Sequence, residues 1–320
     1  MKEKGITGST LKIVALVAMT LDHVAWGIID PLLVRAGVST ENFFSPLYSI
    51  SVSPVMCVTS FVFHTVGRIT FPVMLFLLVE GFVHTSSLKK YIRNMAVFAL
   101  LSELPFNLAF SNKLLSSGSN VPYLEGQNVF VTLTLSLVML AAVNYLTETQ
   151  KLPAFLGAAG VIGTAALSFS VSFFPVAKTA AAFGFKANII SVSVCAFAVF
   201  LILLMLIRRA DSDKRAGISL SMLVILIFAA ISYVLESDYC FTGVVAAALM
   251  YFLRKNKTAE YAAGCAYLLS CSFSEAGTVL GLPLVAAYNG KRGLKLKYVF
   301  YIYYPAHLLV IWAVRAIMKI

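Results

Sequence analysis

Charged residues are scarce in this sequence. Lysine, arginine, aspartate and glutamate together make up 12% of the 320 residues, whereas a soluble domain carries about 25%. Hydrophobic residues make up 60%, and the mean hydropathy is +0.88. A soluble fold of this size has too little interior to bury so many apolar side chains. The composition therefore excludes a soluble globular protein, a disordered chain and a disulfide scaffold, and predicts an integral membrane protein.

Cysteines are few and carry no chemical pattern. The sequence has five, namely Cys57, Cys195, Cys240, Cys265 and Cys271. Their number is odd and their spacing matches neither a metal site nor a redox motif. Most lie in apolar runs, where cysteine usually acts as a small hydrophobic residue. We therefore expect no metal cofactor.

Acidic residues are outnumbered by basic ones, 14 against 25, which gives a formal net charge of +11. In a soluble protein this excess would suggest nucleic-acid binding. In a membrane protein, lysine and arginine instead mark the cytoplasmic loops. We therefore expect a lipid bilayer as partner and no nucleic acid. Basic loops could also hold a phosphorylated co-substrate.

The apolar runs predict an all-α fold, a polytopic transmembrane helical bundle of about 10–11 spans that forms a single integral membrane domain over residues 1–320. The predicted spans are 11–29, 61–84, 91–110, 128–147, 153–173, 188–207, 217–235, 239–253, a broken stretch at 259–289, and 298–318. The number depends on whether 259–289 is a hairpin of two short spans or one broken helix.

The segment between the first two predicted spans, residues 30–59, contains Pro31, Pro46 and Pro54. Proline commonly marks loops and turns. We therefore expect a loop with an interfacial piece here.

Several polar residues fall inside the predicted spans, where each ionisable group costs free energy. Such a residue is therefore a candidate for a structural or functional role. Counting 1.5 Å per residue puts His23 about 18 Å from the cytoplasmic edge of its span. The polar residues expected in the outer half of the membrane are Asp22, His23, Arg68, Glu103, Asn107, Gln127, Asn128 and Asp238. Tyr304 and His307 are expected nearer the cytoplasm.

Adjacent residues on a helix diverge by about 100°, which disfavours a direct bond between Asp22 and His23. Arg68 or Glu103 is the more plausible partner for one of them. A single buried ion pair can also serve only to hold helices together. From these residues alone, a membrane enzyme and a transporter both remain open.

Several stretches in order along the chain resemble the TraX family of membrane acetyltransferases. They are Leu11–Ala15 running into Leu21-Asp22-His23, then Gly67–Pro72, Leu78–Thr85, Leu101–Phe110, Gln127–Leu133, Ser237–Tyr239 with Gly243, Tyr288–Gly293 and Tyr301–Leu308. The chain departs from the family pattern at Asn107, where aspartate is frequent, and at Gly126, where histidine is frequent. Residues 43–60 resemble an insertion.

The resemblance implies a relative of the wider transmembrane acyltransferases, in which acetyl-CoA binds from the cytoplasm and an intramembrane histidine is central. The family takes its name from a conjugation protein that acetylates the pilin N-terminus. His23 would then be the base or transient acyl carrier, with Asp22 as its electrostatic support. Arg68 and Asn128 would stabilise the oxyanion or orient a carboxylate, and Glu103 is a second acid/base candidate.

The same resemblance suggests where the two substrates bind. Phosphates of CoA would meet the basic inner face, and the residues expected there are Lys89, Lys90, Arg93, Arg254, Lys291 and Arg292, with Tyr304 and His307 deeper in the membrane. The acceptor would approach from outside and contact Asn107, Gln127 and Asp238. It could be a peptide N-terminus, a sugar or a small amine. A proton-coupled transporter or flippase would use the same buried charges.

The lysine and arginine bias predicts a cytoplasmic N-terminus and an extracellular loop at 111–127 in the cytoplasmic membrane. Single cysteines placed in that loop should react with a membrane-impermeant thiol reagent on intact cells, whereas cysteines in 208–215 should react only after lysis. Labelling of 208–215 from outside would reverse the predicted orientation.

Overall fold

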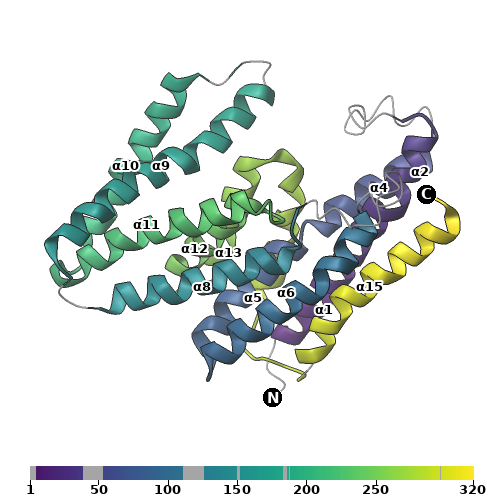
Figure 1. Cartoon of the computed structure of the whole chain (residues 1–320), viewed down its shortest axis with the longest axis horizontal. Coiled ribbons are helices and arrows are strands. Elements are labelled where there is room, and N and C mark those ends of the chain that lie inside the picture. The colour runs from purple at the N-terminus through teal and green to yellow at the C-terminus, as the bar shows by residue number, and fades with distance from the viewer. Residues whose placement is uncertain are drawn as a thin grey trace. The chain divides into compact units, whose positions relative to one another are not determined.

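Helices are the only regular secondary structure in the described part of the chain (Figure 1). The computed structural model describes residues 5–38, 53–110, 126–149, 152–182, 186, 188–295 and 297–320. Every regular element in these ranges is a helix, and none is a strand. The predicted all-α class is therefore confirmed.

Seven helices in the described residues are long and apolar enough to cross a membrane. They are Gly8–Arg35, Pro54–His84, Val129–Glu148, Phe155–Ala180, Ile189–Arg209, Ser212–Val234 and Tyr298–Met318. Two shorter apolar helices are Cys240–Leu253 and Phe273–Ala286. The chain is thus a membrane protein with several apolar helices, and the total of ten or eleven crossings stays a prediction.

The helices fall into two compact units. The first comprises Met1–Leu77, Ala96–Asn128 and Ser274–Ile320, and the second comprises Leu78–Met95 and Val129–Phe273. Two helices, α5 (Thr70–His84) and α6 (Leu88–Phe110), pass from one unit into the other.

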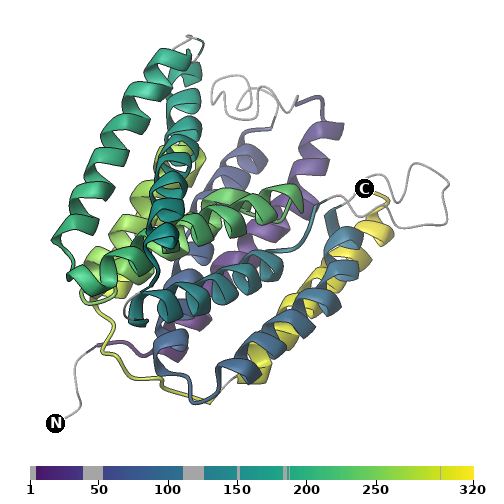
Figure 2. The same cartoon turned by 60° about the vertical axis from the view of Figure 1, so that its left-hand side comes forward.

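The first unit opens with a long interrupted helix. It consists of α1 (Gly8–Val24), the π-helical stretch η1 (Ala25–Ile29) and α2 (Asp30–Arg35). The unit also contains α4 (Pro54–Gly67), the 3₁₀ helix η2 (Phe273–Gly281), α14 (Leu282–Ala286) and α15 (Lys297–Met318). α1 packs against α4 and against α15, and α15 lies beside the last part of α6 in both views (Figures 1 and 2).

The expected loop at 30–59 is wrong at both ends. The first helix continues to Arg35, and the second span begins at Pro54. Pro54 stands in the first turn of α4, where proline lacks only an N–H that would have no helical partner anyway. Pro31 follows the π-helical stretch within the continuous helix Gly8–Arg35, where it interrupts the regular hydrogen-bond pattern without ending the helix. Neither proline marks a loop here. Pro46 lies outside the described residues.

The predicted break within 259–289 is present. Helix α13 (Lys257–Cys271) ends at Ser272, and η2 and α14 follow it. The break thus begins at Ser272, just before the stretch Ser274–Gly277 near the middle of 259–289.

The start of α1 is hydrogen-bonded to the segment that precedes α15. The backbone N–H groups of Gly8 and Ser9 donate to the carbonyl oxygens of Lys291 and Arg292, at 2.8 and 2.9 Å. The ammonium of Lys12 lies 5.2 Å from the centre of the Phe300 ring. Basic residues that were expected on the cytoplasmic side therefore gather at one end of the first unit.

The second unit is a helical bundle. Its members are α8 (Val129–Glu148), α9 (Ala154–Ala182), α10 (Ile189–Arg209), α11 (Ser212–Val234), α12 (Cys240–Leu253) and α13, with parts of α5 and α6. α9 lies along both α10 and α11 (Figure 1).

Glycines on α9 let it approach α11 closely. A Cβ at Gly160 would come within 2.5 Å of the Leu220 backbone nitrogen, and one at Gly163 within 2.5 Å of the Leu223 Cβ. At Gly157 the nearest atom would be 3.7 Å away, which is an ordinary contact. Small residues on such a face permit the close backbone packing that holds membrane helices together.

We expect Gly160→Ala and Gly163→Ala to destabilise the protein by about 1–3 kcal/mol, because the added methyl group overpacks the α9–α11 contact. Gly157→Ala is the matched control, since it adds the same methyl group to the same helix at an ordinary contact distance. Thermal unfolding in detergent measures the difference. Equal melting temperatures for all three variants would show that the close contact does not matter.

Candidate functional site

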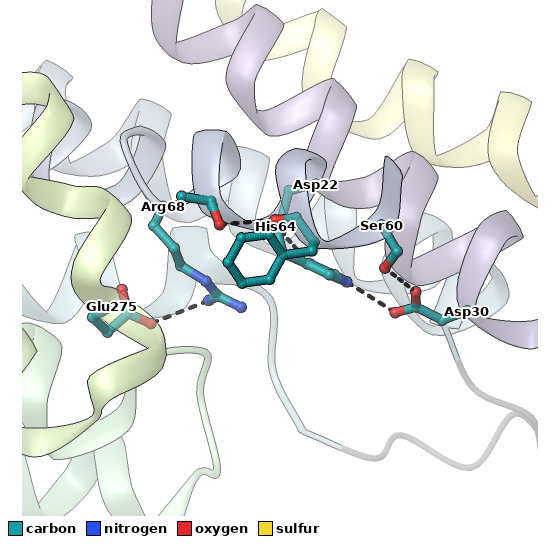
Figure 3. A network of polar contacts seen from close by, with 8 residues as sticks. Asp22, Asp30, Ser60, His64, Arg68 and Glu275 are labelled. Carbon is teal, nitrogen blue, oxygen red and sulfur yellow. Dashed lines mark hydrogen bonds and ion pairs between the residues drawn. The ribbon is translucent and has the colours of Figure 1, made fainter. Parts of the chain in front are cut away.

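His64 lies between two carboxylates in the first unit (Figure 3). Its Nδ1 is 2.7 Å from Oδ1 of Asp22 on α1, and its Nε2 is 2.9 Å from Oδ2 of Asp30 at the start of α2. The hydroxyl of Ser60, one turn before His64 on α4, donates to the other oxygen of Asp30 at 2.7 Å. Three helical segments thus meet in one hydrogen-bonded chain.

The π-helical stretch explains how one ring reaches both carboxylates. Asp22 and Asp30 are eight residues apart, so in an unbroken α-helix they would point about 80° apart. A π-helix is wider, and five residues that turn by roughly 80° each, instead of 100°, remove about 100° of this rotation. Both carboxylates then lie on the face that packs against α4.

The three side chains share at least one proton. An ionised carboxylate only accepts hydrogen bonds, so each ring nitrogen of His64 that bonds to one must donate. Both bonds form together when the imidazole is protonated, or when one carboxyl group is protonated instead. The side chains of Asp22, His64 and Asp30 are only 15–18% exposed. The network is therefore a protein-held proton site inside a membrane-spanning region.

A buried ion pair extends this cluster. Arg68, the residue that follows α4, places Nη1 3.1 Å from Oε1 of Glu275 on η2. A Cβ on Gly277 would overlap the carbonyl oxygen of Thr65, so glycine is needed for η2 to lie against the end of α4. Likewise, a Cβ on Gly67 would overlap the side chain of Asp22.

His23 belongs to a second polar contact on the neighbouring face of α1. Its Nδ1 is 2.7 Å from Nε2 of His307 on α15. The rings of Phe110 and Tyr304 stand edge-on to His23, with centroids at 5.1 and 6.1 Å. Nearby, the Thr20 and Tyr303 hydroxyls are 2.7 Å apart. The structure therefore brings His307 to His23, although depth along the sequence had placed it nearer the cytoplasm.

Glu103 forms a third group with two amides. Its Oε1 accepts from Nδ2 of Asn107 at 2.9 Å, and its Oε2 accepts from Nδ2 of Asn128 at 2.5 Å. The Asn128 amide also donates to the carbonyl oxygen of Ala99 at 2.8 Å. Both amide hydrogens of Asn128 are thus used within the protein, which argues against the expected oxyanion contact. Gln127 is half-buried beside Asn128.

The remaining predicted residues divide between the units. Lys291 and Arg292 belong to the first unit, and Lys89, Lys90, Arg93 and Arg254 belong to the second. Arg254 lies over the Tyr251 ring, with its guanidinium carbon 3.9 Å from the ring centre. Asp238 is exposed in the second unit, and its backbone carbonyl accepts from the Thr132 hydroxyl.

His64, Asp30 and Glu275 were not among the site residues predicted from the sequence. A signal was present, because Ser60, His64 and Arg68 follow one another at intervals of four, which places them on one helix face. The predicted bounds hid it, since the second span was expected to begin at residue 61, just after Ser60, and the expected loop at 30–59 contained Asp30. Within the described residues, no group of three or more His, Cys, Asp or Glu side chains is arranged to hold a metal ion.

Comparisons with known proteins extend these observations. A sequence profile of the TraX family, described as TraX protein, matches residues 7–174 and 172–315. The chain is also 29% identical over 130 residues to the probable fimbrial assembly protein FimC, serogroup H1, of Dichelobacter nodosus. That match spans 41% of this chain and 43% of the relative, so it covers less than half of either. No solved structure is significantly similar to the chain.

The buried pair between Arg68 and Glu275 yields a stability prediction. Arg68→Met should lower the free energy of unfolding by about 3 kcal/mol, because the Glu275 carboxylate, 9% exposed, loses its cation. Arg68→Met with Glu275→Gln should recover part of that loss, since no uncompensated charge remains. Thermal unfolding in detergent measures both.

The control is the surface pair of Lys214 and Glu148, 3.7 Å apart with side chains 36% and 64% exposed. Lys214→Met should change stability by less than about 1 kcal/mol. If the Arg68 and Lys214 single variants unfold alike, the buried pair is not a structural constraint.

Proposed function

Because the chain belongs to the TraX family, we propose that it is a membrane-embedded acetyltransferase. In this proposal it moves an acetyl group from cytoplasmic acetyl-CoA to an amine or hydroxyl acceptor at the outer side of the cytoplasmic membrane. Acetyl-CoA is a co-substrate, and no metal takes part. The fimbrial relative supports an acceptor such as a pilin N-terminus, and an envelope glycan is the other candidate class.

The observation that carries the proposal is the position of His23. It lies about 22 Å along the helix from Gly8, deep in a membrane-spanning segment, and its ring is held by His307 among aromatic side chains. A fixed imidazole suits a general base, or a nucleophile that carries the acetyl group. A partly buried, oriented histidine at this depth has no obvious use in a protein that only assembles with others.

The basic end of the first unit supports a CoA site. Lys291 and Arg292 flank the start of α1, near Lys12. Cations on a membrane face attract and bind phosphates. In this proposal CoA binds there, and its acetyl group reaches toward His23.

The charged cluster beside His23 supports stabilisation of the reacting groups. Arg68 lies in this cluster with its charge partly balanced by Glu275. It is our candidate for stabilising the oxyanion that forms when the thioester is attacked. Glu103 keeps its role as second acid/base candidate, with Asn107 and Asn128 holding its carboxylate.

A second function, a proton-coupled transporter or flippase of a small envelope precursor, is favoured by one observation. The Asp22–His64–Asp30 chain holds a proton between helices, as proton relays in transporters do. Such a protein would move its substrate across the membrane of a vesicle without consuming acetyl-CoA. Acetyl-CoA turnover by the purified protein therefore separates the two functions.

The experiment uses the purified full chain in vesicles with radiolabelled acetyl-CoA, together with mass spectrometry of envelope material from cells with and without the protein. We expect acetyl-CoA consumption and a mass increase of one acetyl group on an envelope component. Substrate flux with no acetyl-CoA consumption would favour the transporter instead.

His23→Ala should abolish acetyl transfer while the protein still inserts and binds acetyl-CoA. Loss of a general base lowers the rate by roughly 10²–10⁴, and loss of an obligatory acyl carrier lowers it further. His23→Gln keeps a hydrogen-bonding group but no basic nitrogen, so it should be equally inactive. Asp22→Asn should be milder if Asp22 only supports the site. Near-normal turnover in either His23 variant would remove His23 from the chemistry.

A further inference from the structure

The hydrogen bond between His23 and His307 has a direction that a third group fixes. Nδ1 of His307 lies 2.9 Å from the backbone carbonyl oxygen of Tyr303. A carbonyl oxygen only accepts, so this nitrogen carries a hydrogen. A neutral imidazole has a single N–H, so Nε2 of His307 must accept. The bond of 2.7 Å from His23 therefore begins at an Nδ1–H of His23.

We infer that His307 is a positioning residue that holds His23 in its Nδ1–H tautomer, so that Nε2 of His23 presents a lone pair to the substrates. The chemical use of that lone pair rests on the proposed acetyltransferase function. His307 itself is 8% exposed, and its ring nitrogens contact His23 and Tyr303. In this inference His307 orients His23, whereas the resemblance had placed His307 among the residues that contact acetyl-CoA.

The neutral forms are the ones that fit this arrangement. Two protonated rings could not share the bond, because neither nitrogen would hold a lone pair. Both histidines lie in membrane-spanning helices, where a charge costs free energy. In neutral histidine, the hydrogen bond made by one ring nitrogen decides which nitrogen is protonated.

The proton balance of the proposed reaction follows. The acceptor N–H or O–H bond breaks, and its proton moves to Nε2 of His23. The acceptor atom forms a bond to the acetyl carbonyl carbon, the C–S bond breaks, and CoA leaves as a thiolate that takes the proton from Nε2. Throughout, Nδ1–H of His23 stays bonded to His307, which orients the ring and stabilises its transient charge, as a triad's third member does.

Nitrogen NMR of the uniformly ¹⁵N-labelled protein in detergent tests the tautomer directly. The chain has only four histidines, so His→Gln variants assign every ring signal. We expect a protonated Nδ1 and an unprotonated Nε2 in both His23 and His307. In His307→Phe, which keeps a ring of similar size without an acceptor, His23 should lose its fixed Nδ1–H. An Nε2–H tautomer of His23 in the unaltered protein would overturn the inference.

Kinetics test whether the tautomer matters. His307→Phe should lower kcat for acetyl transfer by about 100-fold with the Kd for acetyl-CoA unchanged, which is at the upper end of the loss seen when an outer partner that orients a histidine is removed. His307→Gln can still accept from Nδ1–H of His23, so it should retain at least about tenfold more activity than Phe. Combined with His23→Ala, His307→Phe should have no further effect, because the two act as a unit.

The matched control is His84→Phe. Nδ1 of His84 contacts the carbonyl oxygen of Glu80 at 2.8 Å, the same bond one turn back that His307 makes, but its side chain is exposed in the second unit. It should leave kcat unchanged. A His307→Phe variant that weakens acetyl-CoA binding with normal kcat would make His307 a cofactor contact and overturn the positioning role.

The two proposals can fail separately. If the protein consumes no acetyl-CoA but His23 shows the Nδ1–H tautomer, the acetyltransferase proposal fails and the positioning by His307 stands. If acetyl transfer is normal in His307→Phe, the positioning role fails and the acetyltransferase proposal stands. Should His307→Phe not fold, the NMR spectra of the unaltered protein and of His307→Gln decide.

Discussion

Hydrocarbon offers no hydrogen-bond partners, so every polar group inside a membrane-spanning helix has to find its partner within the protein. In the first unit this constraint decides which helices meet. Asp22 and Asp30 need a donor from α4 and find His64. Arg68 draws η2 against the end of α4 through Glu275. The contacts between these elements follow from pairing their polar side chains as much as from burying their apolar ones.

The class of the protein was predictable because it depends on composition and on the length of apolar runs, which are local properties. Asp22, His23, Arg68 and Glu103 could be selected for the same reason, since each is a polar residue inside such a run. Their partners could not be selected this way. Glu275 is 207 positions from Arg68, and only packing brings them to 3.1 Å.

The error at 30–59 shows how one local rule hid part of the site. Proline is common in loops, yet it also fits the first turn of a helix, as at Pro54, and a helix that a π-helical stretch interrupts, as at Pro31. With both segments helical, Asp30 and Ser60 fall on helices beside His64. A π-helical turn adds a second difficulty, because it changes the face on which later residues lie and leaves no clear mark in the hydrophobic pattern.

Asp22 and His23 are neighbours in sequence, yet the structure gives them different partners on different sides of α1. Asp22 turns toward His64 on α4, and His23 turns toward His307 on α15. The divergence of adjacent helical residues, about 100°, makes this separation unavoidable. It also separates two kinds of chemistry, a charged carboxylate–imidazole chain and a pair of imidazoles among aromatic rings.

Because Asp22 and His23 have different partners, the carboxylate of Asp22 does not bond to the imidazole of His23, and this affects how His23 can act as a base. If Asp22 bonded to His23 directly, its charge would favour the protonated ring, which has no lone pair to offer. Because His64 takes the Asp22 carboxylate, His23 is held by a neutral acceptor instead. Asp22 is still the sequence neighbour of His23, so its negative charge can stabilise a positive ring that forms during a reaction. An imidazole that is neutral at rest and stabilised when charged would suit the acetyl transfer that we propose.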